Sequence, residues 1–264
     1  MNVVISNSDM RQVLDKAHFN AILLAGDIYQ IESITFGNWF TLSQKLVKQT
    51  SVYELDFTWR SKNQELLDLW ELVRNGDDRV DEMLVKKEFS EEISEEIFKK
   101  QNDDEIILCL NYDGLYGINS INYYLQSDNN NKSIVLNLGT YKVGDPIIFG
   151  DTNRFSPVIY NNLKGKIVNI EEDEIRVWFS VEIDKVVNEL EIQYLDLELL
   201  GESDNNKSIV KFYVDKYRND DEDDDSDLTT IVPFSVAYAV SIHKSQGLEY
   251  NSVKIIITNE IDEL

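Results

Sequence analysis

The chain has 264 residues, 42% of them hydrophobic and 11% aromatic, which is enough to bury a large core and excludes a disordered chain. Its formal net charge of -24 argues against a protein that grips nucleic acid through a basic surface, so any DNA contact must be local. The single cysteine excludes a disulfide framework and, with only two distant histidines, predicts no metal site. No apolar run approaches the roughly 18 residues of a membrane span, so we expect no membrane association. A cytoplasmic setting fits this cysteine usage.

Short apolar runs alternate with helical patterns in the first half of the chain. Residues 21–25 (AILLA), 51–57 and 105–110 have the composition of buried strands. Residues 61–74 have the apolar spacing of an amphipathic helix. Residues 89–100 have Ser90 as a candidate N-cap, with Glu91 and Glu92 in the first turn of a helix. Strands that alternate with helices predict an α/β fold with a largely parallel sheet.

The pattern changes after Gly139. From residue 141 to about residue 200, short strands follow one another without a long helical period, which predicts a small β-barrel inserted into the α/β domain. Residues 218–227 then form an acidic loop with seven carboxylates. Apolar segments at residues 232–241 and 253–258 return to the α/β pattern.

The most specific string in the chain is SIHKSQGLEY, residues 241–250, which stands between two apolar runs. A turn from a strand into a helix directs backbone amides and short hydroxyls at an anion, so such a string can hold a phosphate. Gly247 lets the backbone approach a ligand closely. The plain structural alternative is a capped helix start with a surface lysine and glutamate.

This string resembles motif V of RecD-like helicases of superfamily 1, where Thr-x-His-Lys-Ser-Gln-Gly-Ser-Glu stands. Ser241 replaces the threonine and keeps a hydroxyl, and Leu248 replaces the later serine. The resemblance implies one set of residues that face DNA and a second set that faces ATP. The DNA set is Ser241, His243, Lys244, Ser245 and Gln246, and the ATP set is Gly247 and Glu249.

Two weaker strings resemble motifs III and IV of the same superfamily and stand in the same order along the chain. In GDIYQ the resemblance places Gly26 and Asp27 beside ATP and makes Gln30 the sensor of its γ-phosphate. In LDFTWRS it makes Arg60 the residue that reaches the γ-phosphate. Gln30 and Arg60 are therefore the catalytic candidates. A turn with a capping aspartate and an ordinary arginine at a helix start are the alternatives.

Residues 111–126 and 141–165 also resemble the RecD-like branch, the second as the opening of its inserted barrel of the Src-homology-3 type. The implied fold is α/β, a RecA-like second motor domain of the P-loop NTPase type with that barrel inserted. Residues 1–50 would be a remnant of the first RecA-like domain. The second domain would take residues 51–140 and 229–264, and the barrel with its acidic loop residues 141–228.

Three motifs of a complete motor are missing from the sequence. There is no Gly-x-x-x-x-Gly-Lys-Ser/Thr, no Asp-Glu pair before Gly26, and no Thr-Arg after residue 258. We therefore expect the C-terminal part of an ATP-dependent DNA helicase. The resemblance of the inserted barrel to the RecD-like branch implies 5′ to 3′ polarity. The partners of this chain would be single-stranded DNA and the missing N-terminal motor domain. ATP and Mg²⁺ would bind the full-length motor, and neither would bind this chain tightly.

A second hypothesis is a degenerate helicase remnant that binds DNA or a protein without hydrolysis, and the excess of acidic residues favours a protein partner.

Overall fold

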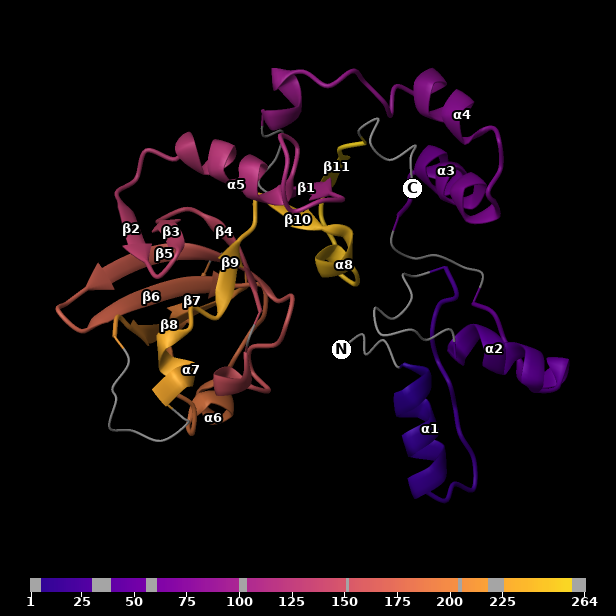
Figure 1. Cartoon of the computed structure of the whole chain (residues 1–264), viewed down its shortest axis with the longest axis horizontal. Helices are drawn as coiled ribbons and strands as arrows, with labels where there is room; N and C mark the ends of the chain where they lie inside the picture. The colour runs from indigo at the N-terminus through magenta and orange to yellow at the C-terminus, as the bar shows by residue number, and fades with distance from the viewer. Residues whose placement is uncertain are drawn as a thin grey trace. The chain divides into compact units, whose positions relative to one another are not determined.

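The computed structural model describes residues 6–29, 39–55, 61–99, 104–150, 152–203, 206–217 and 226–257. The chain divides into two compact units, Met1–Ser94 and Glu95–Leu264, whose elements are labelled in Figure 1. Among the residues described, no helix combines the length and the hydropathy that a membrane crossing requires.

The first unit contains short helices. They are α1 (Asn7–Lys16), α2 (Trp39–Leu46), the 3-10 helix η1 (Gln49–Ser51), α3 (Gln64–Asn75) and α4 (Val80–Lys86). Helix α3 begins where the side chain of Asn63 accepts hydrogen bonds from two backbone amides, and ends at Gly76 in the left-handed region (φ 61°). The helix predicted over residues 61–74 is confirmed.

The two strands predicted in this unit are wrong. Residues 21–25 are irregular, and the side chain of Leu23 is 95% exposed. Ser51 belongs to η1, residues 52–55 are irregular, and residues 56 and 57 lie outside the described residues. A strand needs a neighbouring strand that completes its backbone hydrogen bonds. The described part of this unit contains no strand, so neither segment has such a neighbour there.

The helix predicted over residues 89–100 is also wrong. Residues 89–94 are irregular and only the 3-10 helix η2 (Glu95–Phe98) forms. An α-helix here would align Glu91 with Glu95 and Glu92 with Glu96, and like charges four residues apart destabilise a helix.

In the second unit a parallel sheet has the order β10–β1–β11, with β1 (Glu105–Cys109) in the centre, β10 (Ala239–Ser241) and β11 (Ser252–Ile255). This confirms the strand predicted at residues 105–110. Helix α5 (Ile118–Ser127) packs its buried isoleucines against Ile107 and Cys109 on one face. The opposite face packs Ile106 and Val240 against Leu248 and Tyr250.

The other sheet is antiparallel, with the order β7–β8–β6–β5–β4–β9 (Figure 1). Its strands are β4 (Pro146–Phe149), β5 (Lys164–Glu172), β6 (Arg176–Ile183), β7 (Glu198–Glu202), β8 (Ser208–Asp215) and β9 (Phe234–Val236). A hairpin of β2 (Ser133–Leu136) and β3 (Gly139–Lys142), the helices α6 (Glu189–Ile192) and α7 (Ser226–Thr230), and the 3-10 helix η3 (Asn153–Phe155) surround it. Every second side chain of β8 is buried, so this sheet covers the largest core.

The predicted barrel is not confirmed, because this sheet is open between β7 and β9 within the described residues. Closure requires the two edge strands to pair with each other. Strand β9 is three residues long, and after two further residues the chain enters β10 of the parallel sheet. That leaves β9 too short to close the sheet on β7.

Candidate nucleic-acid interface

The string at residues 241–250 forms the predicted turn from a strand into a helix. Strand β10 ends at Ser241, and α8 (Ile242–Ser245) is a single helical turn. The side chain of Ser241 caps it by accepting a hydrogen bond from the backbone N–H of Lys244 at 3.3 Å. The hydroxyl of Ser245 donates to the carbonyl of Ile242 at 2.9 Å. Both hydroxyls therefore shape the turn.

Gly247 reverses the chain after α8 and has a φ of 82°, a conformation that glycine adopts without strain. The turn is closed by the backbone N–H of Leu248, which donates to the carbonyl of Ser245 at 3.0 Å. Leu248 and Tyr250 then pack under the parallel sheet. The turn is thereby anchored to the core on both sides.

The polar side chains of this turn differ in exposure. His243 and Glu249 are exposed, whereas Lys244, Ser245 and Gln246 are partly buried. Lys244 forms no ion pair with any residue that the structure describes. An ammonium that no described carboxylate pairs with can form a charge-assisted hydrogen bond with an anion from outside.

The topology of the parallel sheet places this turn at a crevice. The connection that follows β1 packs α5 on one face of the sheet, and the connection that follows β10 packs Leu248 and Tyr250 on the other. Cys109 and Ser241, at the carboxyl ends of β1 and β10, lie side by side in the register. In open α/β sheets ligands bind outside the carboxyl ends of such a strand pair.

A groove of about 400 Å³ opens beside this crevice. Its walls come from the loop after β1, α5, the β2–β3 hairpin, β9, β10 and α8. The lining residues are Tyr112, Ile118, Asn119, Asn122, Tyr123, Gln126, Leu138, Gly139, Thr140, Tyr141, Ile148, Phe234, Ser235, Val236, Ala239, Val240, Ser241 and Lys244. We call this set the groove. Only Ser241 and Lys244 of the predicted DNA residues line it.

The contribution of α5 to this site was not predicted from the sequence. Buried Ile118 and Ile121 mark one face of that helix, and the exposed Asn119 and Tyr123 mark the other. This alternation is visible in the sequence NYDGLYGINSINYYLQ. Which element the exposed face lies beside could not be read from it.

The buried carboxylate of Asp145 connects the two sheets by hydrogen bonds near the start of the motif string. Asp145 has no exposed surface, and its oxygens accept hydrogen bonds from Gln126 (2.5 Å) and Asn129 (2.8 Å) of the α5 region. They also accept from the backbone of Lys142 and the hydroxyl of Tyr238, each at 2.9 Å. Burial and the nearby Asp145 raise the pKa of Tyr238, so this hydroxyl remains a donor.

Asn122 holds the strand that enters the motif string. Its side chain accepts from the backbone N–H of Ala239 at 2.9 Å and donates to the carbonyl of Ala239 at 3.0 Å. It thus pairs with the free edge of β10 as a neighbouring strand would.

Lys164 of β5 contacts the C-terminal end of the motif string. Its ammonium donates to the carbonyl of Glu249 at 2.7 Å and to Asp104 at 3.0 Å, and lies 4.3 Å from the ring centre of Tyr250. Burial, followed by the charges of Asp104 and Asp184, raises the pKa of Tyr250. Residues of the antiparallel sheet region therefore hold both ends of the segment that carries the motif string.

The remaining candidates come from the N-terminal part of the chain. Asp27 accepts a hydrogen bond from the backbone N–H of Tyr29 at 2.9 Å, as a turn aspartate does, and Gly26 immediately precedes it in an irregular segment. Gln30 and Arg60 lie outside the described residues. Gly26 and Asp27 belong to the first compact unit, and Gly247 and Glu249 to the second.

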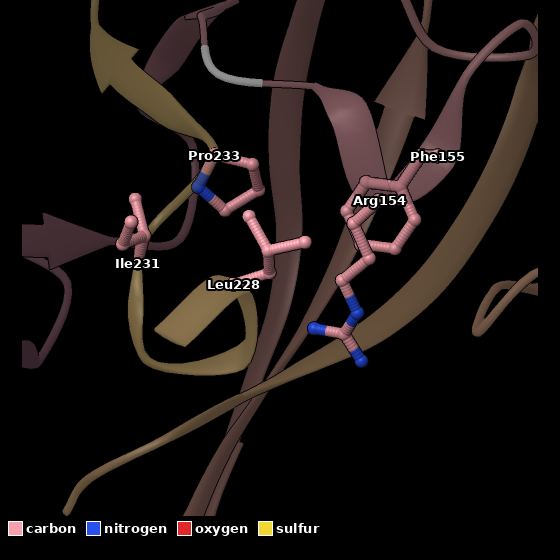
Figure 2. Close-up of a pocket in the computed structure, with 5 residues that line it drawn as sticks. All are labelled: Arg154, Phe155, Leu228, Ile231 and Pro233. Carbon is pink, nitrogen blue, oxygen red and sulfur yellow. The ribbon is translucent and has the colours of Figure 1, made fainter. Parts of the chain in front are cut away.

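Two other features do not form a ligand site. A cavity lined by Arg154, Phe155, Leu228, Ile231 and Pro233 has a volume of only about 10 Å³, which is the space of one water molecule (Figure 2). Figure 2 shows the guanidinium of Arg154 turned away from the three aliphatic side chains. Burial raises the pKa of the Cys109 thiol to about 11, which makes it a poor nucleophile.

Comparison with known proteins supports the family resemblance. No protein-family model matches the chain. The RecD subunit of the RecBCD enzyme from Buchnera aphidicola subsp. Acyrthosiphon pisum (strain APS) is 26% identical over 181 residues, which cover 64% of this chain and 24% of RecD.

Two solved structures of the Pif1 helicase from Bacteroides also match. One is in complex with ADP-AlF3 and single-stranded DNA, and the other is bound to single-stranded DNA. Their TM-scores are 0.45 and 0.46 at 16% and 17% identity, and each match covers 79% of this chain and 46% of the Pif1 chain.

The chain thus spans about a quarter of the length of RecD and less than half of the Pif1 chains. Three observations agree with the predicted helicase resemblance. They are the mixed α/β architecture, the strand-to-helix turn at the motif string and the similarity in sequence to RecD. The similarity in sequence to RecD agrees with the resemblance to the RecD-like branch of superfamily 1 helicases that the motif strings predicted.

Proposed function

We propose that the chain is the C-terminal part of the motor of an ATP-dependent DNA helicase, and that its segment at residues 241–246 holds the phosphate backbone of single-stranded DNA. The resemblance of this segment to motif V supports this class of ligand, and the two matched Pif1 structures were solved with single-stranded DNA. Gly247 and Glu249 would face ATP in the complete motor, together with Gly26, Asp27, Gln30 and Arg60.

The observation that carries the proposal is the position of Lys244. It lies in a turn at the carboxyl edge of a parallel sheet, lines the groove and forms no ion pair with a described residue. The exposed side chain of His243 lies one residue before it in the same turn. A phosphate at this edge would receive a charge-assisted hydrogen bond from the ammonium.

Fluorescence anisotropy with a labelled oligo-dT strand, measured over a range of salt concentrations, tests this contact. Each phosphate contact on a single strand contributes about -0.7 to the slope of log K against log salt concentration. We expect Lys244→Gln to weaken binding and to reduce the steepness of this slope by about 0.7. We expect the double variant His243→Ala with Gln246→Ala to weaken binding more than Lys244→Gln does.

Lys86→Gln is the matched control, because Lys86 is an exposed lysine of the first unit and its replacement changes the net charge by the same amount. The control should leave both the affinity and the slope unchanged. Equal loss in the two lysine variants would show that binding follows only the overall charge, and the proposed contact would be wrong.

The proposal also covers nucleotide turnover. The sequence contains no Gly-x-x-x-x-Gly-Lys-Ser/Thr to hold the β- and γ-phosphates, so the chain alone should not hydrolyse ATP with Mg²⁺. Phosphate release from the pure chain that disappears in Arg60→Ala would contradict this part of the proposal.

A further inference from the structure

We infer that the groove is a nucleobase site, in which bases of the bound single strand stack on Tyr112 and Tyr123 while their phosphates run past Lys244; this inference rests on the proposed function. The motif resemblance assigns neither tyrosine. The argument depends on the size of the groove, on its exposed rings, on its charge and on the fixed position of its walls.

The size of the groove fits a small planar group. Its volume of about 400 Å³ lies within the range of roughly 300–1,000 Å³ that is usual for pockets that bind small molecules. It is continuous with the proposed phosphate contact, because Ser241 and Lys244 form part of its lining. A strand whose phosphate lies at Lys244 can therefore place a base in the groove without leaving the surface.

Two tyrosine rings of the groove are largely open to solvent. Tyr123 on α5 is 78% exposed and Tyr112 in the loop after β1 is 52% exposed. Leu138, at the tip of the β2–β3 hairpin, also lines the groove and is fully exposed. Exposed rings beside a cation are the features on which single-stranded nucleic acids bind, since every base has a face that stacks on an aromatic ring.

The charge of the groove differs from that of the whole chain. Asp and Glu make up 49 of the 264 residues, yet among the residues that the structure describes no Asp or Glu lines the groove, whereas Lys244 does. Neutral amides and hydroxyls complete the polar lining, for example Asn119, Thr140 and Ser235. A polyanion in the groove therefore meets little repulsion from the side chains that line it, although the protein as a whole is acidic.

The walls of the groove are held in place by hydrogen bonds that do not involve the rings. The carbonyl of Tyr112 accepts from the backbone N–H of Asn119 at 3.0 Å, which fixes the loop on the start of α5. Gln126 donates to the carbonyl of Thr140 at 2.9 Å, which fixes the hairpin on the end of α5. Both rings can therefore stack on a ligand without reorganisation of the backbone.

The test measures binding of the full chain to two labelled strands of equal length, oligo-dT and the same backbone with abasic sites. Tyr123→Ala, alone and with Tyr112→Ala, should weaken binding to oligo-dT by roughly fivefold or more, since stacking on one ring is worth about 1–3 kcal/mol per base. The same variants should bind the abasic strand as the wild type does. Tyr123→Phe should retain binding, because the phenyl ring still stacks.

Tyr194→Ala is the matched control, since Tyr194 is 90% exposed and lies outside the groove. Equal losses on oligo-dT and on the abasic strand, or no loss in the tyrosine variants, would overturn the nucleobase site. In that case normal sensitivity to Lys244→Gln would leave the proposed function standing. Absence of wild-type binding to both strands at low salt would overturn the proposed function, and the nucleobase site with it.

Discussion

At the scale of single residues, the absence of a side chain at Gly117 determines the position of one wall of the groove. Gly117 lies at the N-cap of α5, where its N–H donates to the carbonyl of Gly114 at 3.1 Å. A Cβ atom at this position would stand 2.4 Å from the carbonyl oxygen of Asp113. That oxygen belongs to the backbone, so the loop that carries Tyr112 would have to move.

We expect Gly117→Ala to lower the free energy of unfolding by about 1–3 kcal/mol, as overpacking in a tight site does, and to weaken oligo-dT binding. Urea denaturation and anisotropy measure the two effects. Gly150→Ala is the control, because a Cβ atom there would meet no atom within 4 Å. Wild-type stability in Gly117→Ala would show that the loop can move without cost.

At the scale of secondary-structure elements, Asp145 connects three of them. Its carboxylate accepts hydrogen bonds from the α5 region through Gln126 and Asn129, and from the segment before β10 through Tyr238. Asp145 itself immediately precedes β4. Because the groove lies between α5, the hairpin and β10, this buried network determines the spacing of its walls.

We expect Asp145→Asn to destabilise the protein, because an amide keeps the shape of the carboxylate but replaces one acceptor oxygen with a donor. At least one buried donor then loses its acceptor, at a cost of about 1–3 kcal/mol each. Urea denaturation gives the change. Asp128→Asn, at an exposed carboxylate after α5, should have little effect. Equal stability of both variants would show that the network contributes little.

At the scale of the whole molecule, the buried apolar side chains are unevenly distributed between the two units. All three hydrophobic clusters lie within residues 97–256. In the described part of the first unit, Met10 and Leu69 are the buried hydrophobic residues, and Leu23, Tyr53 and Leu55 are almost fully exposed. Burial of apolar surface is the main source of stability, so the second unit carries most of it.

We expect a fragment of residues 95–264 to fold by itself, with a cooperative urea transition and with the oligo-dT affinity of the full chain within about threefold. The reason is that both the core clusters and the groove lie inside it. Circular dichroism and anisotropy measure the two properties. A fragment without a cooperative transition would show that the first unit contributes to the fold of the second.

Local signals in the sequence were sufficient for several elements. Asn63 and Gly76 delimit α3 because capping and the left-handed glycine act within a few residues. The run at residues 105–110 becomes the central strand of a parallel sheet, where both faces are covered and a continuous apolar run is required. The motif string also indicated its own strand, turn and helix, and the relationship to RecD.

Tertiary structure alone decided the features that depend on partners distant in sequence. Residues 21–25 have the composition of a strand but no described neighbour, and β9 is too short to close the antiparallel sheet. The groove likewise joins Tyr112, Tyr123, Leu138 and Lys244, which are up to 132 residues apart in the chain. Periodicity and capping report only the next few residues, whereas strand pairing and a binding surface arise from which elements meet in space.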